Sequence, residues 1–169
     1  MSVTFDLVCH PDTPTKAVKG VNVTVDRQAQ NRIGLDFTLE GNRGVSLPQR
    51  GWDEPARTDR LWEKTCFEAF VMAGSGPAYV EYNFSSTEDW AAYQFDSYRL
   101  GMRNLHAREP TYHRYGGQGL VNVLVDLTGI GLLDTGEPLR LGLSAVLLDR
   151  NGRKSYWALA HPAGKPDFH

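Results

Sequence analysis

Short runs in which apolar and polar residues alternate fill most of the chain and predict a protein built from β-strands. Successive side chains of a strand point to opposite faces, so alternation directs one set toward a core and the other toward solvent. Residues rich in Gly, Pro, Asn and Asp separate the runs, as is typical of turns. The predicted strands are 3–9, 21–25, 33–39, 66–71, 78–84, 90–95, 121–127, 139–147 and 155–160. Many short strands with this punctuation indicate an all-β sandwich or barrel.

Three connections carry additional information. Asn151-Gly152 lies between two predicted strands, and Asn-Gly favours the positive φ values of a two-residue hairpin turn. Residues 41–60 are rich in Gly, Pro and charge, and long loops of this kind are often binding loops. The stretch from Tyr98 to Gly119 is basic and aromatic, and we expect loops or edge strands there.

Two neighbouring strands near the middle of the chain present polar groups on one face. In the first, the apolar residues Phe67, Ala69 and Val71 share one face, and Glu68 lies on the other. In the second, Glu81 and Asn83 belong to the polar set, while Val80, Tyr82 and Phe84 form the apolar one. Trp62 precedes the first strand. The pattern predicts a polar surface beside an aromatic ring, which suits ligand binding better than catalysis.

Length and composition narrow the class of protein. A chain of 169 residues with 41% hydrophobic content is expected to form a single domain, residues 1–169. The formal net charge of −2 argues against a nucleic-acid partner. No apolar run approaches the roughly 20 residues of a membrane span, and no signal peptide is recognisable, so we expect a cytoplasmic protein without a membrane partner. Cys9 and Cys66 give no disulfide framework and are expected to be buried free thiols.

The stretch Leu61-Trp62-Glu63-Lys64-Thr65-Cys66-Phe67-Glu68-Ala69-Phe70-Val71 resembles a motif of the family 9 carbohydrate-binding modules, in which a Trp precedes a strand with a Glu six positions further on. Residues 79–85, 139–149 and 155–157 also resemble strands of that family. The closing segments 157–162 and 165–169 are similar to bacterial DOMON-like proteins. The resemblance implies an immunoglobulin-like or jelly-roll β-sandwich of mostly antiparallel strands that holds a sugar or haem.

The family likeness also implies a site. Sugar-binding members enclose a terminal ring between two tryptophans; Trp62 matches the first, and the place of the second holds Phe168 and histidines. We therefore expect the tail, residues 161–169, to fold back beside Trp62. The ligand-binding residues predicted from the pattern and the resemblance together are Trp62, Glu68, Glu81, Asn83, Arg99, Asp167, Phe168 and His169.

Several alternatives remain open at this stage. Trp62 is either a core plug or a binding platform, and Glu68 and Glu81 are either a hydrolytic carboxylate pair or part of a solvated face bridged to Arg99 or Arg103. A divalent metal would be held by His161, Asp167 and His169. Haem would need Met72 or Met102 with His106 or His113. No nucleophile elbow, P-loop or dinucleotide fingerprint is present.

The sequence thus predicts a non-catalytic domain that binds a saccharide or sugar-like ligand. The alternative is a protein-interaction module whose contact surface is the stretch from Tyr98 to Tyr115, and a metal- or haem-binding domain is the third possibility. The oligomeric state is not predicted.

Overall fold

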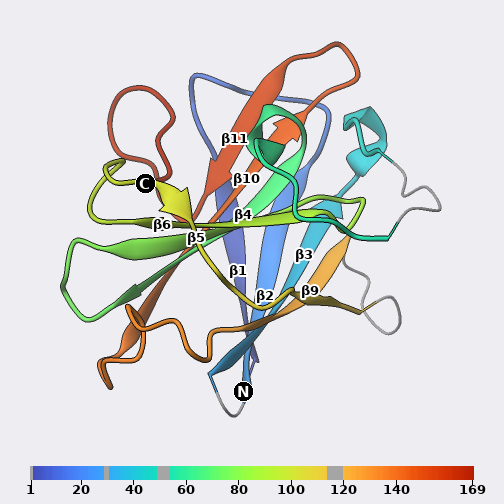
Figure 1. Ribbon diagram of the computed structural model, residues 1–169. Coiled ribbons are helices and arrows are strands. Elements are labelled where there is room, and N and C mark those ends of the chain that lie inside the picture. The colour runs from blue at the N-terminus through green and yellow to red at the C-terminus, as the bar shows by residue number, and fades with distance from the viewer. Residues whose placement is uncertain (1, 29–30, 49–53, 114–119) are drawn as a thin grey trace.

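The computed structural model describes residues 2–28, 31–48, 54–113 and 120–169, and it is an all-β protein (Figure 1). Helical structure in these ranges is limited to two short 3-10 turns, η1 (Asn42–Gly44) and η2 (Leu61–Glu63), and they contain no helix that is long and apolar enough to cross a bilayer. The strands are β1 (Ser2–Cys9), β2 (Gly20–Gln28), β3 (Arg32–Glu40), β4 (Cys66–Ala73), β5 (Tyr79–Phe84), β6 (Trp90–Phe95), β7 (Arg103–Asn104), β8 (Thr111–Tyr112), β9 (Val121–Asp126), β10 (Leu139–Leu148) and β11 (Lys154–Ala158).

Each alternating run of the sequence forms a strand, with ends that shift by a few residues. The run 90–95, which is rich in aromatic residues, is strand β6 as predicted. The described part of the stretch predicted as loop or edge contributes the two-residue strands β7 and β8, which lie at the two ends of the sheet. Residues 114–119 of that stretch and 49–53 of the long connection lie outside the described residues.

The strands form one large antiparallel sheet that curls into a half-barrel (Figure 1). Their order is β7-β6-β5-β4-β10-β11-β1-β2-β3-β9-β8. Strand β1 joins the two halves, because it pairs with β2 from Ser2 to Leu7 and with β11 only at Val8 and Cys9. Where two separate sheets are expected from the sequence, the structure therefore has a continuous one.

The main core lies inside the curl and draws side chains from both halves. The ring centroids of Phe37 on β3 and Phe67 on β4 are 5.2 Å apart, which brings the halves into direct contact. Tyr82 and Phe84 stack at 6.1 Å on β5, and both are fully buried. Each such ring contributes about 1.5–3 kcal/mol through burial. The apolar sets predicted for β4 and β5 are all members of this core.

The opposite face of β4, β5 and β6 is also buried, which corrects the expectation of a surface open to water. Glu68, Glu81 and Asn83 are only 4%, 5% and 0% exposed. Aromatic residues on the same face form a second cluster, and Trp62 and Phe168 pack against it. The cluster consists of Phe70, Tyr79, Ala91, Tyr93 and Phe95. The alternation predicted correctly which side chains share a face, but it does not reveal that η2 and the tail cover the polar face.

The two cysteines are free, as predicted. Cys66 is completely buried, whereas Cys9 is only partly buried. Burial raises the pKa of the Cys66 thiol well above its usual range, and the nearby Glu68 adds to the shift. The thiol of Cys66 is therefore an inert part of the interior rather than a nucleophile.

The hairpin between β10 and β11 has a different turn from the one predicted. The backbone N–H of Asp149 donates to the carbonyl of Arg153 at 2.8 Å, and the N–H of Gly152 donates to the carbonyl of Asp149 at 3.1 Å. Three residues, 150–152, therefore form the loop, and only Gly152 has a positive φ, 80°. This is the three-residue hairpin with a left-handed glycine, which uses the same Asn-Gly pair as the two-residue turn.

We expect Gly152→Val to lower the free energy of unfolding by about 1 kcal/mol or more, because a β-branched residue resists a positive φ. Urea denaturation followed by far-ultraviolet circular dichroism measures the change. Gly76→Val is the control, since Gly76 lies in a turn, has open space around its Cβ position and has no positive φ. Equal effects of the two substitutions would contradict the turn assignment.

Candidate functional site

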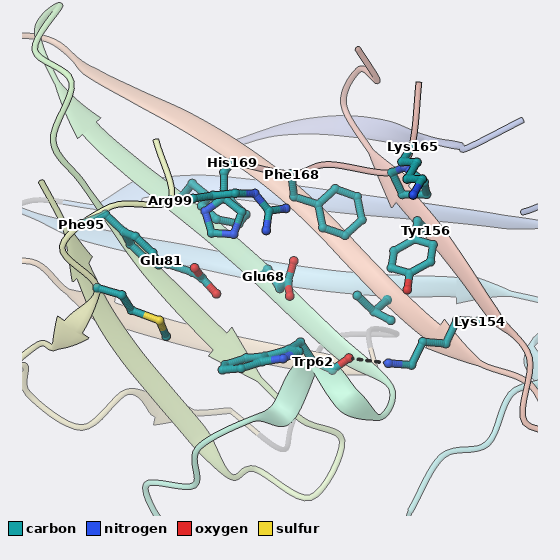
Figure 2. Close-up of a pocket in the computed structure, with 14 residues that line it drawn as sticks. Trp62, Glu68, Glu81, Phe95, Arg99, Lys154, Tyr156, Lys165, Phe168 and His169 are labelled. Carbon is teal, nitrogen blue, oxygen red and sulfur yellow. Dashed lines mark hydrogen bonds between the residues drawn. The ribbon is translucent and has the colours of Figure 1, made fainter. Parts of the chain in front are cut away.

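A cavity of about 550 Å³ opens on the outer face of the half-sheet formed by β4, β5, β10 and β11. Figure 2 shows Trp62 on one side, Phe168 and His169 on the opposite side, and the carboxyl group of Glu68 between them. Its walls come from η2, from five strands or their connecting loops, and from the tail. The lining residues are Trp62, Glu68, Phe70, Glu81, Phe95, Arg99, Met102, Val146, Lys154, Tyr156, Lys165, Pro166, Phe168 and His169.

Strand register brings the two glutamates together. Glu68 on β4 is paired with Asn83 on β5, and Glu81 lies two residues before Asn83, so the glutamates are diagonal neighbours on one face. On the other side of β4, Ser144 of β10 is the direct partner of Glu68. The alternation of these strands thus gathers four polar side chains in an otherwise aromatic environment.

Each glutamate is held by one protein hydrogen bond. The hydroxyl of Ser144 donates to Glu68 Oε2 at 2.6 Å, and the amide of Asn83 donates to Glu81 Oε1 at 2.7 Å. Asn83 Oδ1 in turn accepts from the Cys66 thiol at 3.4 Å. Within the described ranges the second oxygen of each carboxyl has no protein hydrogen bond. Since both residues line the cavity, these oxygens are available to a ligand.

Burial controls the charge of the pair. Loss of hydration raises the pKa of Glu68 to about 8, and repulsion from Glu81 acts in the same direction. Burial also raises the pKa of Glu81, against the effect of the Asn83 hydrogen bond. At neutral pH Glu68 therefore keeps its proton and has an O–H to donate, which an ionised carboxylate lacks. The pair can offer a ligand both a donor and acceptors.

Trp62 is a wall of the cavity rather than a plug of the main core. It lies in η2, which begins after Arg60 in a left-handed conformation, and its ring meets the edge of Tyr93 at 5.8 Å. The Trp62 carbonyl accepts a hydrogen bond of 3.1 Å from Lys154 Nζ (Figure 2). The Tyr93 contact thus orients the partly buried indole, the Lys154 bond holds the backbone that carries it, and the ring lines the cavity.

The tail folds back beside Trp62, as the sequence predicted, and a polar clasp holds it there. Arg99 donates to Asp167 Oδ1 from Nε at 3.3 Å and from Nη2 at 2.9 Å. The hydroxyl of Tyr98 donates to the other carboxylate oxygen of Asp167. The Arg99 and Tyr98 hydrogen bonds help to hold the pKa of Asp167 below its usual range, although partial burial acts in the opposite direction. The clasp positions Phe168 and His169 against the aromatic cluster.

The imidazole of His169 is neutral and fixed in orientation. Its Nδ1 lies 2.6 Å from the hydroxyl of Tyr79, which also accepts a hydrogen bond from the backbone N–H of Arg99 at 3.3 Å. The ring packs edge-on against Phe95 at 5.1 Å and Phe70 at 5.4 Å. This packing lowers the pKa of His169 to about 4, mainly through loss of hydration. The neutral ring has a single N–H, and the bond between its Nδ1 and the Tyr79 hydroxyl fixes the orientation of the ring.

Most of the predicted site residues meet at this cavity. Those that line it are Trp62, Glu68, Glu81, Arg99, Phe168 and His169. The other two lie behind the lining, where Asn83 supports Glu81 and Asp167 supports Arg99. Neither arginine considered as a partner of the glutamates forms a salt bridge with them among the described residues. Arg99 pairs with Asp167, and Arg103 pairs with Asp96 at 2.7 Å.

The residues suggested as metal or haem ligands are dispersed. The described residues contain no group of three His, Cys, Asp or Glu side chains that could hold a metal ion. His161 Nε2 donates to the carbonyl of Val8 at 2.7 Å, while Asp167 is engaged in the clasp. Met102 lines the cavity, whereas His106 lines a separate hollow beside Arg57.

Sequence reasoning missed one end of the cavity. Lys154, Tyr156 and Lys165 line it together with Val146. Lys154 and Tyr156 alternate with the buried Ser155 and Trp157, and this alternation was the available signal. The alternation gave no indication that β11 lies two strands from β4, because the order of strands in a sheet cannot be read from the local pattern.

The buried Glu68 should make stability depend on pH. Its pKa is raised in the folded protein, so its stabilising contribution is complete below about pH 4.5 and is lost as the pH rises toward about 8. Between these values we expect the free energy of unfolding to fall by up to about 1.4 kcal/mol per pH unit. Urea denaturation from pH 4 to 9 measures this slope. Glu68→Gln should flatten it, and the exposed Glu137→Gln should leave it unchanged; an unaltered slope in Glu68→Gln would exclude Glu68 as its source.

Removal of residues 165–169 should destabilise the protein by about 1–3 kcal/mol, because it uncovers the aromatic cluster and exposes Trp62. Thermal denaturation and the emission maximum of tryptophan fluorescence measure the two effects. Lys165→Ala, which leaves Asp167, Phe168 and His169 in place, is the control and should melt with the full chain. A truncated protein with unchanged stability would show that the tail is not part of the closed site.

No family model, curated protein or solved structure matches this chain. A functional interpretation must therefore start from the site itself. Its chemistry consists of an indole wall, a neutral imidazole in the tail, and two buried carboxyl groups between them, one of which keeps its proton at neutral pH.

Proposed function

We propose that the protein is a non-catalytic domain that binds a saccharide or a sugar-like small molecule. The observation that carries the proposal is the position of Trp62 opposite Phe168 and His169, with the buried carboxyl groups of Glu68 and Glu81 between them. The cavity volume of about 550 Å³ falls within the range of small-ligand pockets, roughly 300–1,000 Å³.

The polarity of the cavity suits a sugar ring. A pyranose has faces of C–H groups that pack on aromatic rings, and a rim of hydroxyls that both donate and accept hydrogen bonds. Trp62 and Phe168 offer aromatic surfaces. Neutral Glu68 can donate to a hydroxyl oxygen, and the unpaired oxygens of both glutamates can accept from hydroxyl protons. The pocket thus has partners for the faces of the ring and for its edge.

The proposal includes the fold class and the family suggested by the sequence. The contact of Phe37 with Phe67 across the core supports a sandwich of immunoglobulin-like or jelly-roll type, within which the curled sheet supplies both layers. The likeness of residues 61–71 to family 9 carbohydrate-binding modules is supported by the position of Trp62 in η2, shortly before β4 begins. We retain membership of the DOMON-like group and a cytoplasmic location as parts of the proposal.

A protein-interaction module is the second candidate, and an exposed apolar strip favours it. Tyr98, Leu100 and Met102 are 56%, 65% and 48% exposed, and they occupy every second position of the loop after β6. Residues 114 and 115 of the predicted contact stretch lie outside the described residues. Loss of self-association or of a protein partner in a Leu100→Ser variant would favour this candidate.

The saccharide hypothesis predicts that Trp62→Ala weakens binding at least tenfold, since a stacked aromatic anchor contributes about 1.5 kcal/mol or more. Titration calorimetry with the best ligand from a glycan array measures the change. Trp62→Phe should keep most of the affinity, and Phe5→Ala, at an exposed aromatic that does not line the cavity, should keep all of it. Absence of binding to any saccharide on the array would contradict the proposed function.

A further inference from the structure

The polar groups of the cavity are divided between its two ends. Figure 2 shows Lys154, Tyr156 and Lys165 together on one side, and Glu81, Phe95 and Arg99 together on the other, with Glu68 in between. The first group comes from β11 and the tail, and the second from β5, β6 and the loop after β6. A ligand that spans the cavity therefore meets ammonium groups at one end and carboxyl groups toward the other.

The two lysines retain hydrogen-bonding capacity. Lys154 Nζ donates to the Trp62 carbonyl, and an ammonium group has two further protons to donate. Lys165 forms no hydrogen bond or ion pair with another described residue, although it lines the cavity. Arg99 differs from them, because Asp167 accepts two of its N–H groups and neutralises its charge. The available positive charge is thus concentrated at the end formed by Lys154 and Lys165.

The carboxyl groups do not cancel this charge. Glu68 is protonated at neutral pH because of its burial, so Glu81 is the main source of negative charge among the lining side chains. Two ammonium groups beside a single carboxylate leave the lining with a net positive charge. Within a partly enclosed cavity such a charge attracts an anion more strongly than it would on an open surface.

We propose, building on the function proposed above, that the saccharide is an acidic sugar with a carboxylate on the ring, such as a hexuronic acid. Its carboxylate lies between Lys154 and Lys165, its ring packs between Trp62 and Phe168, and its hydroxyls contact Glu68 and Glu81. A carboxylate fits this end better than a phosphate does. Lysine charges bind phosphate as well, but phosphate sites often add several backbone N–H groups or the fork of an arginine to them, and the groups named at this end are two point charges and a phenol.

Titration calorimetry with matched sugars tests the inference. The ligands are glucuronate and galacturonate, the neutral glucose and galactose, and glucose 6-phosphate, each at low and at high salt. We expect each uronate to bind about tenfold or more tightly than its neutral counterpart at low salt. This advantage should shrink as salt screens the ion pairs.

Two variants locate the effect. Lys165→Met should reduce the advantage of the uronates over their neutral counterparts to about threefold or less, because Lys165 is exposed and its proposed contact is with the carboxylate. Lys64→Met is the matched control: Lys64 is exposed and lies close to Trp62 in the chain, but it is not a lining residue. It should retain the full advantage.

The outcomes separate the two levels of the proposal. Equal affinity for neutral sugars and uronates would overturn the acidic-sugar inference and leave saccharide binding in place. Tighter binding of glucose 6-phosphate than of glucuronate would overturn the choice of carboxylate. Absence of binding for every sugar would overturn both the inference and the proposed function.

Discussion

The burial of both faces of β4 and β5 is the constraint on which the rest of the structure depends. One face supplies Phe67, Tyr82 and Phe84 to the main core, which ties the two halves of the sheet together. The other face carries Glu68 and Glu81, which would be solvated on an ordinary two-layer protein. Because η2 and the tail cover that face, the carboxyl groups lose water and Glu68 keeps its proton. The candidate site is thus a result of how the covering segments are attached.

Those attachments are polar and specific. Lys154 fixes η2 through the Trp62 carbonyl, and Arg99 with Tyr98 fixes the tail through Asp167. Exposed ion pairs contribute little to stability in general. Asp167 differs because it accepts four hydrogen bonds from three residues in two segments, including one from the backbone N–H of His169. The geometry of the cavity therefore relies on a few contacts at its rim, while the stability of the fold relies on the core beneath.

Local pattern was sufficient to predict the strands and much of the site, for identifiable reasons. Period-two alternation separated Phe67, Ala69 and Val71 from Glu68 correctly, because strand geometry fixes which side chains share a face. Strand order, by contrast, is a long-range property. It decides that Ser144 and Lys154 approach Glu68, and nothing in the run around either residue indicates this neighbour. For the same reason a polar face covered by a distant tail looks like a solvated one. The Asn-Gly pair predicted a turn but not its length, since two hairpin geometries use the same residues.

The pairing of β1 with β11 has a consequence for folding. Val8 and Ala158 are partners, and this short contact between segments far apart in the sequence joins the two halves into one sheet. During synthesis β1 and β2 can form their hairpin early. Val8 and Cys9 at the end of β1, however, can pair only after β11 has been synthesised, about 150 residues later. Contacts of such large sequence separation slow folding and leave strand edges open in the meantime. Closure of the sheet is therefore expected to be a late step. The cavity also needs β11, but through the pairing of β11 with β10, so it can form without the contact between β1 and β11.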